Sequence, residues 1–228
     1  MLGVIVNSLT IALGCIIGLV IKGGIPEKLS TTIMNALALC VLYIGISGAL
    51  EGTNTLITII SMAVGALIGE RIDIDKWLNK LGEYIENKFT KENNKVSISQ
   101  GFVSSSLLFC VGAMAVVGSL DAGLLGNNET LFAKSILDGI TSVIFTATLG
   151  IGVIFSSISV FLYQGSIALG ASFLSSLLSS EVVSSMTAVG SLLIIALGLN
   201  MLKVTNIKVA NLLPAMFLPI LFGIVNLI

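Results

Sequence analysis

Two charged side chains inside an apolar segment are the feature of this sequence that points most directly to chemistry. Lys134 and Asp138 lie within residues 131–149, which are otherwise apolar enough to cross a bilayer. Because they are four residues apart, both side chains lie on one face of an α-helix. At about 1.5 Å per residue, Asp138 would lie roughly 10 Å below the start of that helix. A charge there is costly, so we expect Asp138 either to pair with Lys134 or to be protonated.

This pair has a functional and a structural interpretation. In the first, Asp138 binds a cation or a proton, or Lys134 binds an anion, on a face that lines a path for a solute. In the second, the ion pair only fixes its helix against neighbouring helices. Polar residues that continue the face, or that line the next segment at 152–172, are candidate solute contacts: Thr141, Ser142, Ser156, Tyr163 and Gln164. Their hydroxyl and amide groups could equally bridge helices.

Amides and prolines in other apolar segments are further candidates. Asn7 and Asn35 could each coordinate a cation through the side-chain carbonyl oxygen, or bridge two helices. Pro214 and Pro219 interrupt the last apolar segment. Each proline frees a backbone carbonyl one turn earlier. Freed carbonyls of this kind occur in the broken helices of transporters, and plain kinks are the alternative.

The composition places the chain among membrane proteins. Of its 228 residues, 55% are hydrophobic and only 10% are charged, whereas soluble domains are about 25% charged. Lipid must therefore cover most of its surface. Histidine is absent and the net charge is −1. With no nucleotide-binding loop either, we expect no metal site, no cofactor, no nucleic-acid partner and no enzyme activity.

Apolar segments predict an all-α, polytopic membrane protein. A spanning helix needs roughly 20 mostly apolar residues, and about eight segments qualify. Their bounds are 2–22, 30–50, 54–70, 101–120, 131–149, 152–172, 183–202 and 207–227. Between the third and fourth, apolar residues at helical spacing among Lys and Glu predict an amphipathic helix within residues 70–97. It would lie in the headgroup layer or pack on the protein itself.

Basic residues test this topology, because Lys and Arg concentrate in cytoplasmic loops. With an even helix count and both termini outside, the loops predicted inside hold all basic residues except Lys134. The inner set is Lys22, Lys28, Arg71, Lys76, Lys80, Lys88, Lys91, Lys95, Lys203 and Lys208. The loops predicted outside carry only acidic charges, at Glu51, Asp121, Glu129 and Glu181.

Similar blocks at the two ends of the chain indicate an internal repeat. Residues 3–11 are similar to 152–160, and residues 34–38 to 186–190. Matching helices are an odd number of helices apart, so the copies would run in opposite directions, as in many secondary transporters. Chance similarity of apolar helices is the alternative. The predicted organisation is a first three-helix repeat (1–70), a cytoplasmic amphipathic linker (71–98), a central helix pair (99–150) and a second three-helix repeat (151–228).

The central part of the chain also carries a family resemblance. Residues 109–115, 118–119 and 134–139 form one block, and residues 150–156 with 163–165 form another. Together they resemble the YqgA-like bacterial inner-membrane proteins, a family built on a domain of unknown function. The resemblance covers essentially the whole chain and implies a multi-pass protein of the bacterial plasma membrane. It supplies no activity or substrate, but it adds weight to Lys134, Asp138 and Gln164.

These observations together predict a secondary transporter that moves a small solute or ion by alternating access between the repeats. An ion or solute channel and a non-transporting membrane scaffold are the alternatives. The expected partners are the lipid bilayer and the transported solute or ion. Small-residue faces at Gly14 with Gly18, and at Gly65 with Gly69, could pack within the chain or in a homodimer.

Overall fold

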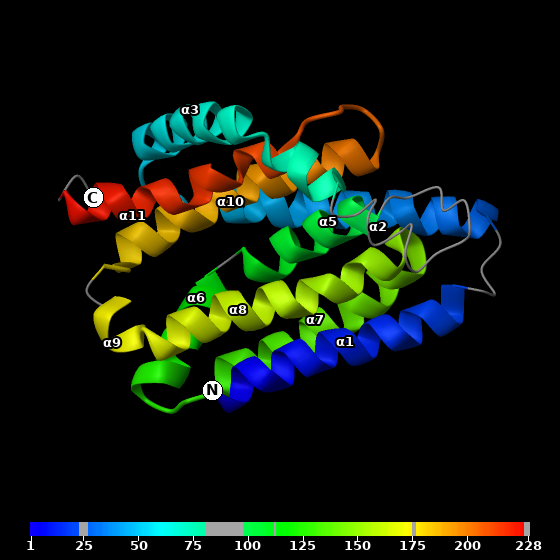
Figure 1. Cartoon of the computed structure of the whole chain (residues 1–228), viewed down its shortest axis with the longest axis horizontal. Helices are drawn as coiled ribbons and strands as arrows, with labels where there is room; N and C mark the ends of the chain where they lie inside the picture. Colours follow the sequence, from blue (N-terminus) through cyan, green and yellow to red (C-terminus); the bar gives the residue numbers. More distant parts are fainter. Residues whose placement is uncertain (23–26, 81–97, 112, 175–176, 226–228) are drawn as a thin grey trace.

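The computed structural model describes residues 1–22, 27–80, 98–111, 113–174 and 177–225, and this part of the chain is helical without a strand. The elements are α1 (Leu2–Lys22), α2 (Glu27–Leu50), α3 (Thr55–Ile72), α5 (Ile98–Cys110), α6 (Ala113–Leu124), α7 (Glu129–Leu149), η1 (Ile151–Phe155), α8 (Ser156–Leu169), α9 (Ala171–Leu174), α10 (Ser180–Met201), η2 (Val209–Phe217) and α11 (Leu218–Ile224). The long helices run back and forth along one axis, and the start of α1 and the end of α11 both lie toward the left of Figure 1.

Six helices of the described chain are long and apolar enough to cross a membrane. The bent pair of α5 and α6 makes a seventh if it counts as one span, while residues Val209–Ile224 form a shorter apolar helix. The all-helical membrane fold predicted from sequence is therefore confirmed. The predicted count of about eight spanning helices is not confirmed, because the fourth and the eighth of the predicted segments are broken.

Exposed apolar side chains agree with a surface covered by lipid. Large hydrophobic residues are exposed along α1, α2 and α3, among them Val20 (78%), Leu50 (81%) and Leu67 (73%). Of the residues in the apolar stretch of α10, by contrast, 78% are buried, against 18% in the apolar stretch of α2. α10 is therefore enclosed by protein, and α2 lies mostly at the periphery.

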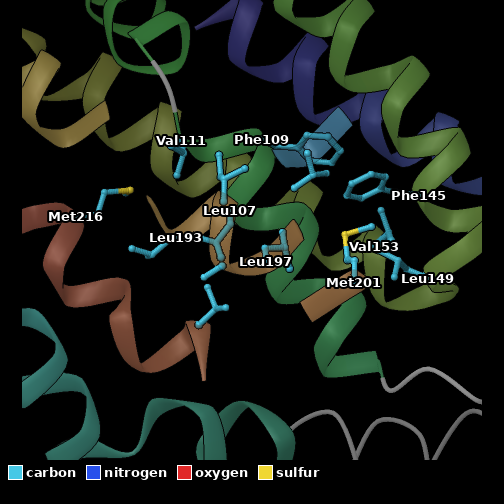
Figure 2. Packing of buried hydrophobic residues seen from close by; sticks show 14 of the residues in the cluster. Leu107, Phe109, Val111, Phe145, Leu149, Val153, Leu193, Leu197, Met201 and Met216 are labelled. Atoms are coloured by element: carbon cyan, nitrogen blue, oxygen red, sulfur yellow. The ribbon is translucent and has the colours of Figure 1, made fainter. Parts of the chain in front are cut away.

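The core forms around α10. Figure 2 shows Leu193, Leu197 and Met201 of α10 packed among apolar residues of α5, α7, η1 and η2. Phe109 of α5 and Phe145 of α7 meet in this core, with ring centroids 6.4 Å apart and an interplanar angle of 36°. This aromatic contact ties α5 to α7 beside the charged segment.

Glycines let α1 lie directly on α7. A Cβ at Gly14 would collide with Ser142 and the Gly139 carbonyl, and one at Gly18 would collide with the Val143 carbonyl. Residues later in α1 contact residues later in α7, so the two helices run parallel. Glycine is needed here because no side chain fits between the two backbones.

The second glycine face packs α3 on η2. Gly65 faces Ala215, and Gly69 faces the backbone of Asn211. Similarly, Gly45 and Gly48 of α2 face α10. Both small-residue faces predicted from the sequence are therefore filled by helices of the same chain.

Three breaks interrupt the helices. α5 and α6 meet at a bend of 61°. The prediction of one continuous helix over residues 101–120 is therefore wrong. Gly150 ends α7 with φ 84°, a conformation that disfavours any residue with a Cβ. The last segment is the 3₁₀-helix η2 with Pro214 inside it, followed by α11 with Pro219 in its first turn.

Only the start of the predicted amphipathic linker lies in the described chain. Residues 74–80 are helical, and Trp77 is 66% exposed, as expected for the headgroup layer. Residues 81–97 lie outside the described residues.

We expect Gly69→Ala to destabilise the protein by about 1–3 kcal/mol, because a methyl group there overlaps the Asn211 backbone. The matched control is Gly165→Ala in α8, where the nearest atom is 3.9 Å away. Thermal unfolding in detergent should show a lower midpoint for the first variant only. Equal midpoints would mean that the close packing of α3 on η2 is wrong.

Candidate functional site

Lys134 and Asp138 form an ion pair on α7. Nζ of Lys134 lies 3.0 Å from each carboxylate oxygen of Asp138. Each side chain is only 8% exposed. The helical spacing predicted from the sequence therefore brings the two charges together, and neither is left alone in the protein interior.

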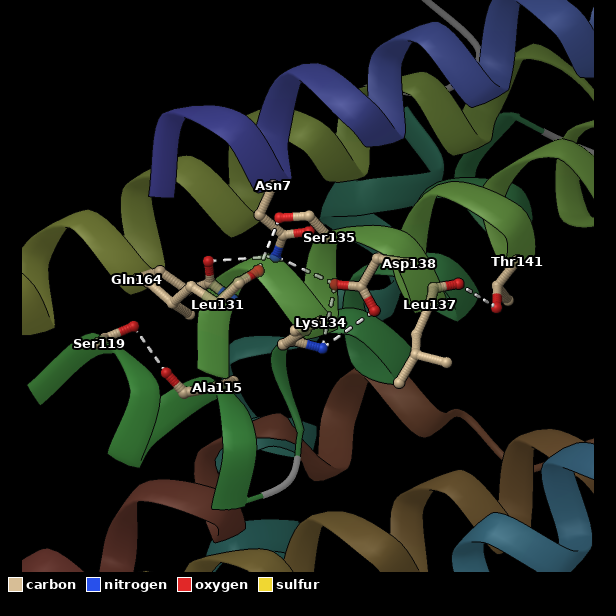
Figure 3. A network of polar contacts seen from close by, with 10 residues as sticks. All are labelled: Asn7, Ala115, Ser119, Leu131, Lys134, Ser135, Leu137, Asp138, Thr141 and Gln164. Atoms are coloured by element: carbon tan, nitrogen blue, oxygen red, sulfur yellow. Dashed lines mark hydrogen bonds and ion pairs between the residues drawn. The ribbon is translucent and has the colours of Figure 1, made fainter. Parts of the chain in front are cut away.

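Amides from two other helices complete a polar cluster around this pair. Asn7 of α1 donates through Nδ2 to Oδ2 of Asp138 at 3.1 Å and to Oε1 of Gln164 at 3.2 Å. Asn7 and Gln164 are both fully buried. We call Asn7, Lys134, Asp138 and Gln164 the Asp138 cluster; Figure 3 shows its contacts.

Local contacts set the register that lets Asn7 reach Asp138. The Gly3 backbone N–H donates to Oδ1 of Asn128, just before α7, at 2.8 Å. The Ser8 hydroxyl donates to the Ser157 carbonyl of α8 at 2.7 Å. α1 is thus anchored to both neighbours within one turn of Asn7.

Two polar atoms of the Asp138 cluster have no hydrogen-bond partner among the described residues. They are Oδ1 of Asn7 and Nε2 of Gln164. An unpaired polar group away from water costs several kcal/mol in a membrane interior. The cluster therefore offers one free acceptor and one free donor next to an ion pair, which is a feature of sites that accept a polar ligand.

Apolar layers close the cluster on both sides along the helix axes. Toward the start of α7, Leu131 packs with Val4, Ala122 and Ala168; we call this the Leu131 layer. Toward the end of α7, Phe145 packs with Phe109; we call this the Phe145 layer. The cluster is occluded between them.

The bend between α5 and α6 lies close to the cluster. Cys110, the last residue of α5, is near enough for the charges of both Lys134 and Asp138 to act on its thiol. Tyr163 of α8 is in turn near Cys110. The C-terminal end of α5, where the bend begins, thus lies near the ion pair.

The other hydroxyls predicted on these helices do not join the cluster. Ser142 donates to the Gly139 carbonyl and Ser156 to the Val153 carbonyl. Thr141 donates to the Leu137 carbonyl on the outer face of α7. Tyr163 is half-buried and packs against the apolar core. The hydroxyls of Thr141, Ser142 and Ser156 thus satisfy nearby backbone acceptors three or four residues earlier, as hydroxyls in membrane helices commonly do.

Asn35 is also separate from the cluster. It is exposed on α2, and α2 packs mainly along α10. The sequence identified an amide in an apolar segment, but it could not tell which face of the helix that amide occupies.

A second polar cluster joins α3 to η2, and sequence reasoning missed it. Asn211 donates through Nδ2 to Oε2 of Glu70 at 2.7 Å, and its Oδ1 accepts from the Asp75 backbone at 2.7 Å. Nζ of Lys208 lies 3.3 Å from Glu70, whose hydrogen bond and charge raise the pKa of Lys208. The signal that selected Asn7, an amide in an apolar segment, applies equally to Asn211.

A cavity of about 620 Å³ lies beside this second cluster. Its walls combine Ala63, Ala66 and Leu67 of α3 with Leu212 of η2, and Arg71 lies among its lining residues. The cavity is open to the outside of the helix pair, so it lies apart from the occluded Asp138 cluster.

The described residues contain no group of three or more His, Cys, Asp or Glu side chains that could hold a metal ion. The Asp138 cluster instead combines one carboxylate, one ammonium and two amides. Such a set can bind or exchange a single positive charge, or hold a small polar solute.

A helical chain with a lipid-facing apolar surface and charges at the depth of its spanning helices is a polytopic membrane protein. The chain belongs to the DUF554 family, described as proteins of unknown function, which matches residues 2–224. This confirms the resemblance noted from the sequence.

Two bacterial relatives match most of the chain. It is 33% identical over 208 residues to the uncharacterized membrane protein YdfK of Bacillus subtilis (strain 168), covering 90% of this chain and 87% of YdfK. It is 30% identical over 203 residues to the uncharacterized protein YqgA of Escherichia coli (strain K12), covering 88% and 86%. No solved structure matches the chain.

We expect Asp138→Asn alone, or Lys134→Met alone, to destabilise the protein by up to about 3–5 kcal/mol, because each leaves an uncompensated buried charge. The double variant should be close to wild type in stability, since it removes both charges. Thermal unfolding of the three variants in detergent measures the coupling. Additive losses in the double variant would contradict a direct ion pair.

Proposed function

We propose that the protein is a secondary transporter that moves a small solute or ion across the bacterial plasma membrane by alternating access. The observation that carries this proposal is the Asp138 cluster itself. A charged, partly unsatisfied site is built from α1, α7 and α8 at the depth of the spanning helices. Ionisable residues in such positions typically mark ion or solute pathways.

The way the helices pair supports this mechanism. α1 packs against α8, α2 against α10, and α3 against η2. In each pair the partners run in opposite directions, as the contacts of Gly45 with Ile195 and of Gly52 with Ala188 illustrate for α2 and α10. These are the pairs expected if residues 1–70 and 151–228 were copies related by a two-fold axis in the membrane plane. Such copies can exchange shapes and so open the site to each side in turn.

Closure on both sides is a further argument for a carrier. Between the Leu131 layer and the Phe145 layer, the Asp138 cluster has the arrangement of an occluded intermediate. A carrier requires that one layer opens while the other stays closed. In a channel, by contrast, both layers would have to open together.

The proposal also includes the orientation of the protein in the membrane. Arg71 and Lys208 lie together at one end of the helices, and α1 begins and α11 ends toward the other end. By the positive-inside rule, the first end would be cytoplasmic and both termini would be outside. The bacterial origin of YdfK and YqgA supports the plasma membrane as the location.

Access to Cys110 tests the mechanism. With Cys15 and Cys40 replaced by Ala, Cys110 is the remaining thiol, and a membrane-impermeant thiol reagent can be applied to right-side-out or inside-out vesicles. Phe145→Ala weakens one layer, so it should increase labelling from the side of the α7 C-terminus and decrease it from the other side. Leu131→Ala should do the reverse, because a shift in population favours one open state at the expense of the other.

A Cys110→Ala version of each variant measures background labelling. A channel predicts that each layer variant raises labelling without lowering it from the opposite side. No labelling above background from either side, in any variant, would favour a scaffold and reject the transporter.

A further inference from the structure

We infer that the Asp138 cluster exchanges one small monovalent cation for one proton, with Lys134 as the group that carries the proton. This inference rests on the proposed transport function and names its substrate class. It follows from the contacts, the charge balance and the oxygen atoms of the cluster.

The ammonium group of Lys134 already occupies the position of a bound cation. It lies 3.0 Å from each oxygen of Asp138, and it reaches them from one turn away on the same helix. A free cation that binds the carboxylate must therefore displace Nζ. Because the side chain of Lys134 is flexible, its ammonium group can move away from Asp138 while the backbone stays in place.

Charge balance forces the displaced lysine to lose its proton. With Asp138 ionised and Lys134 protonated, the pair has no net charge. A monovalent cation added to this pair would leave one uncompensated positive charge among buried groups, which is strongly unfavourable. Neutrality returns when the Nζ–H bond breaks and the proton leaves to water, so that the neutral amine and the cation–carboxylate pair remain.

The reverse step follows when the cation leaves. The amine then takes a proton from water and pairs again with Asp138. One cation is thus exchanged for one proton with no net charge moved. A divalent cation would leave a positive charge even with a neutral lysine, so the site selects monovalent ions.

Oxygen atoms suited to a small hard cation converge on the same place. Asp138 supplies two, and Oε1 of Gln164 lies 3.2 Å from the same Asn7 nitrogen that contacts Asp138. The fully buried Asn7 also carries the acceptor Oδ1, which has no partner among the described residues. Half a turn about its Cβ–Cγ bond exchanges Nδ2 and Oδ1 and would direct an oxygen from a third residue at the site.

No other charge on the packed elements replaces Lys134. Among the described groups, Lys134 is the charged one that acts on Asp138. Cys110 of α5 faces the pair, Cys15 of α1 faces Ser142 and Thr146, and Tyr163 of α8 faces Cys110. Thiols and phenols are neutral at about pH 7. On α6 and α2, Asp121 is partly exposed and Cys40 exposed.

Proteoliposomes with an internal pH dye test the exchange directly. An outward gradient of sodium, lithium or potassium should acidify the lumen for at least one of these ions. For a sodium or lithium gradient, the rate should not change when valinomycin with equal potassium on both sides holds the membrane potential at zero, since no net charge moves. Lys134→Arg keeps the ion pair but cannot release its proton, so exchange should fall by more than about tenfold.

Lys208→Arg is the matched control, because Lys208 is an exposed lysine paired with Glu70, and its exchange rate should equal that of wild type. Binding gives a second readout. Sodium or another active cation should raise the unfolding midpoint of wild type more at about pH 9 than at about pH 6, because each cation that binds releases a proton. In Lys134→Gln this stabilisation should be independent of pH.

Wild-type rates in Lys134→Arg, or cation binding that ignores pH in wild type, would overturn the inference. If no cation moves protons while labelling of Cys110 still alternates between the two sides, the exchange is wrong and the transporter proposal stands. If labelling of Cys110 does not alternate between the two sides and no cation moves protons, both fail together.

Discussion

The cost of a charge away from water is the constraint on which the rest of this structure depends. Asp138 can remain ionised at the depth of the spanning helices only because Lys134 neutralises it and Asn7 donates to it. Neutrality must hold in every conformation through which the protein passes. The need for a positive partner therefore explains the ion pair, and in the proposed exchange it is also the reason why a bound cation requires the loss of a proton.

Close helix packing makes this arrangement attainable. Gly14 and Gly18 allow α1 to lie on α7, and the contact of Gly3 with Asn128 sets its register. Without that approach, the short side chain of Asn7 would not reach Asp138. The same small-residue packing joins α3 to η2, where Asn211 and Glu70 form their own polar contact. In both places the polar contact follows from the packing.

The sequence predicted the parts of the site that depend on local geometry. Helical spacing was enough to pair Lys134 with Asp138, and apolar runs were enough to identify a helical membrane protein. Asn7 and Gln164 were found as amides in apolar segments, but the same rule also selected Asn35, which faces away. Which face of a helix meets protein is decided by tertiary packing, and one sequence does not contain that information directly.

The breaks in the helices show the same limit. Prolines marked the interruption of the last segment, because a missing N–H has a fixed consequence. The 61° bend between α5 and α6 has no proline and was missed, although it approaches the site more closely. Asn211 was overlooked although the rule that selected Asn7 applies to it equally, and its contact with Glu70 is made by tertiary packing.

The most direct test of the account is a structure of the protein determined at alkaline pH with thallium, a monovalent cation that scatters X-rays anomalously. The account predicts an anomalous peak in contact with the Asp138 carboxylate, with Nζ of Lys134 withdrawn from it. An ion pair that stays intact, with no peak between α1, α7 and α8, would contradict it.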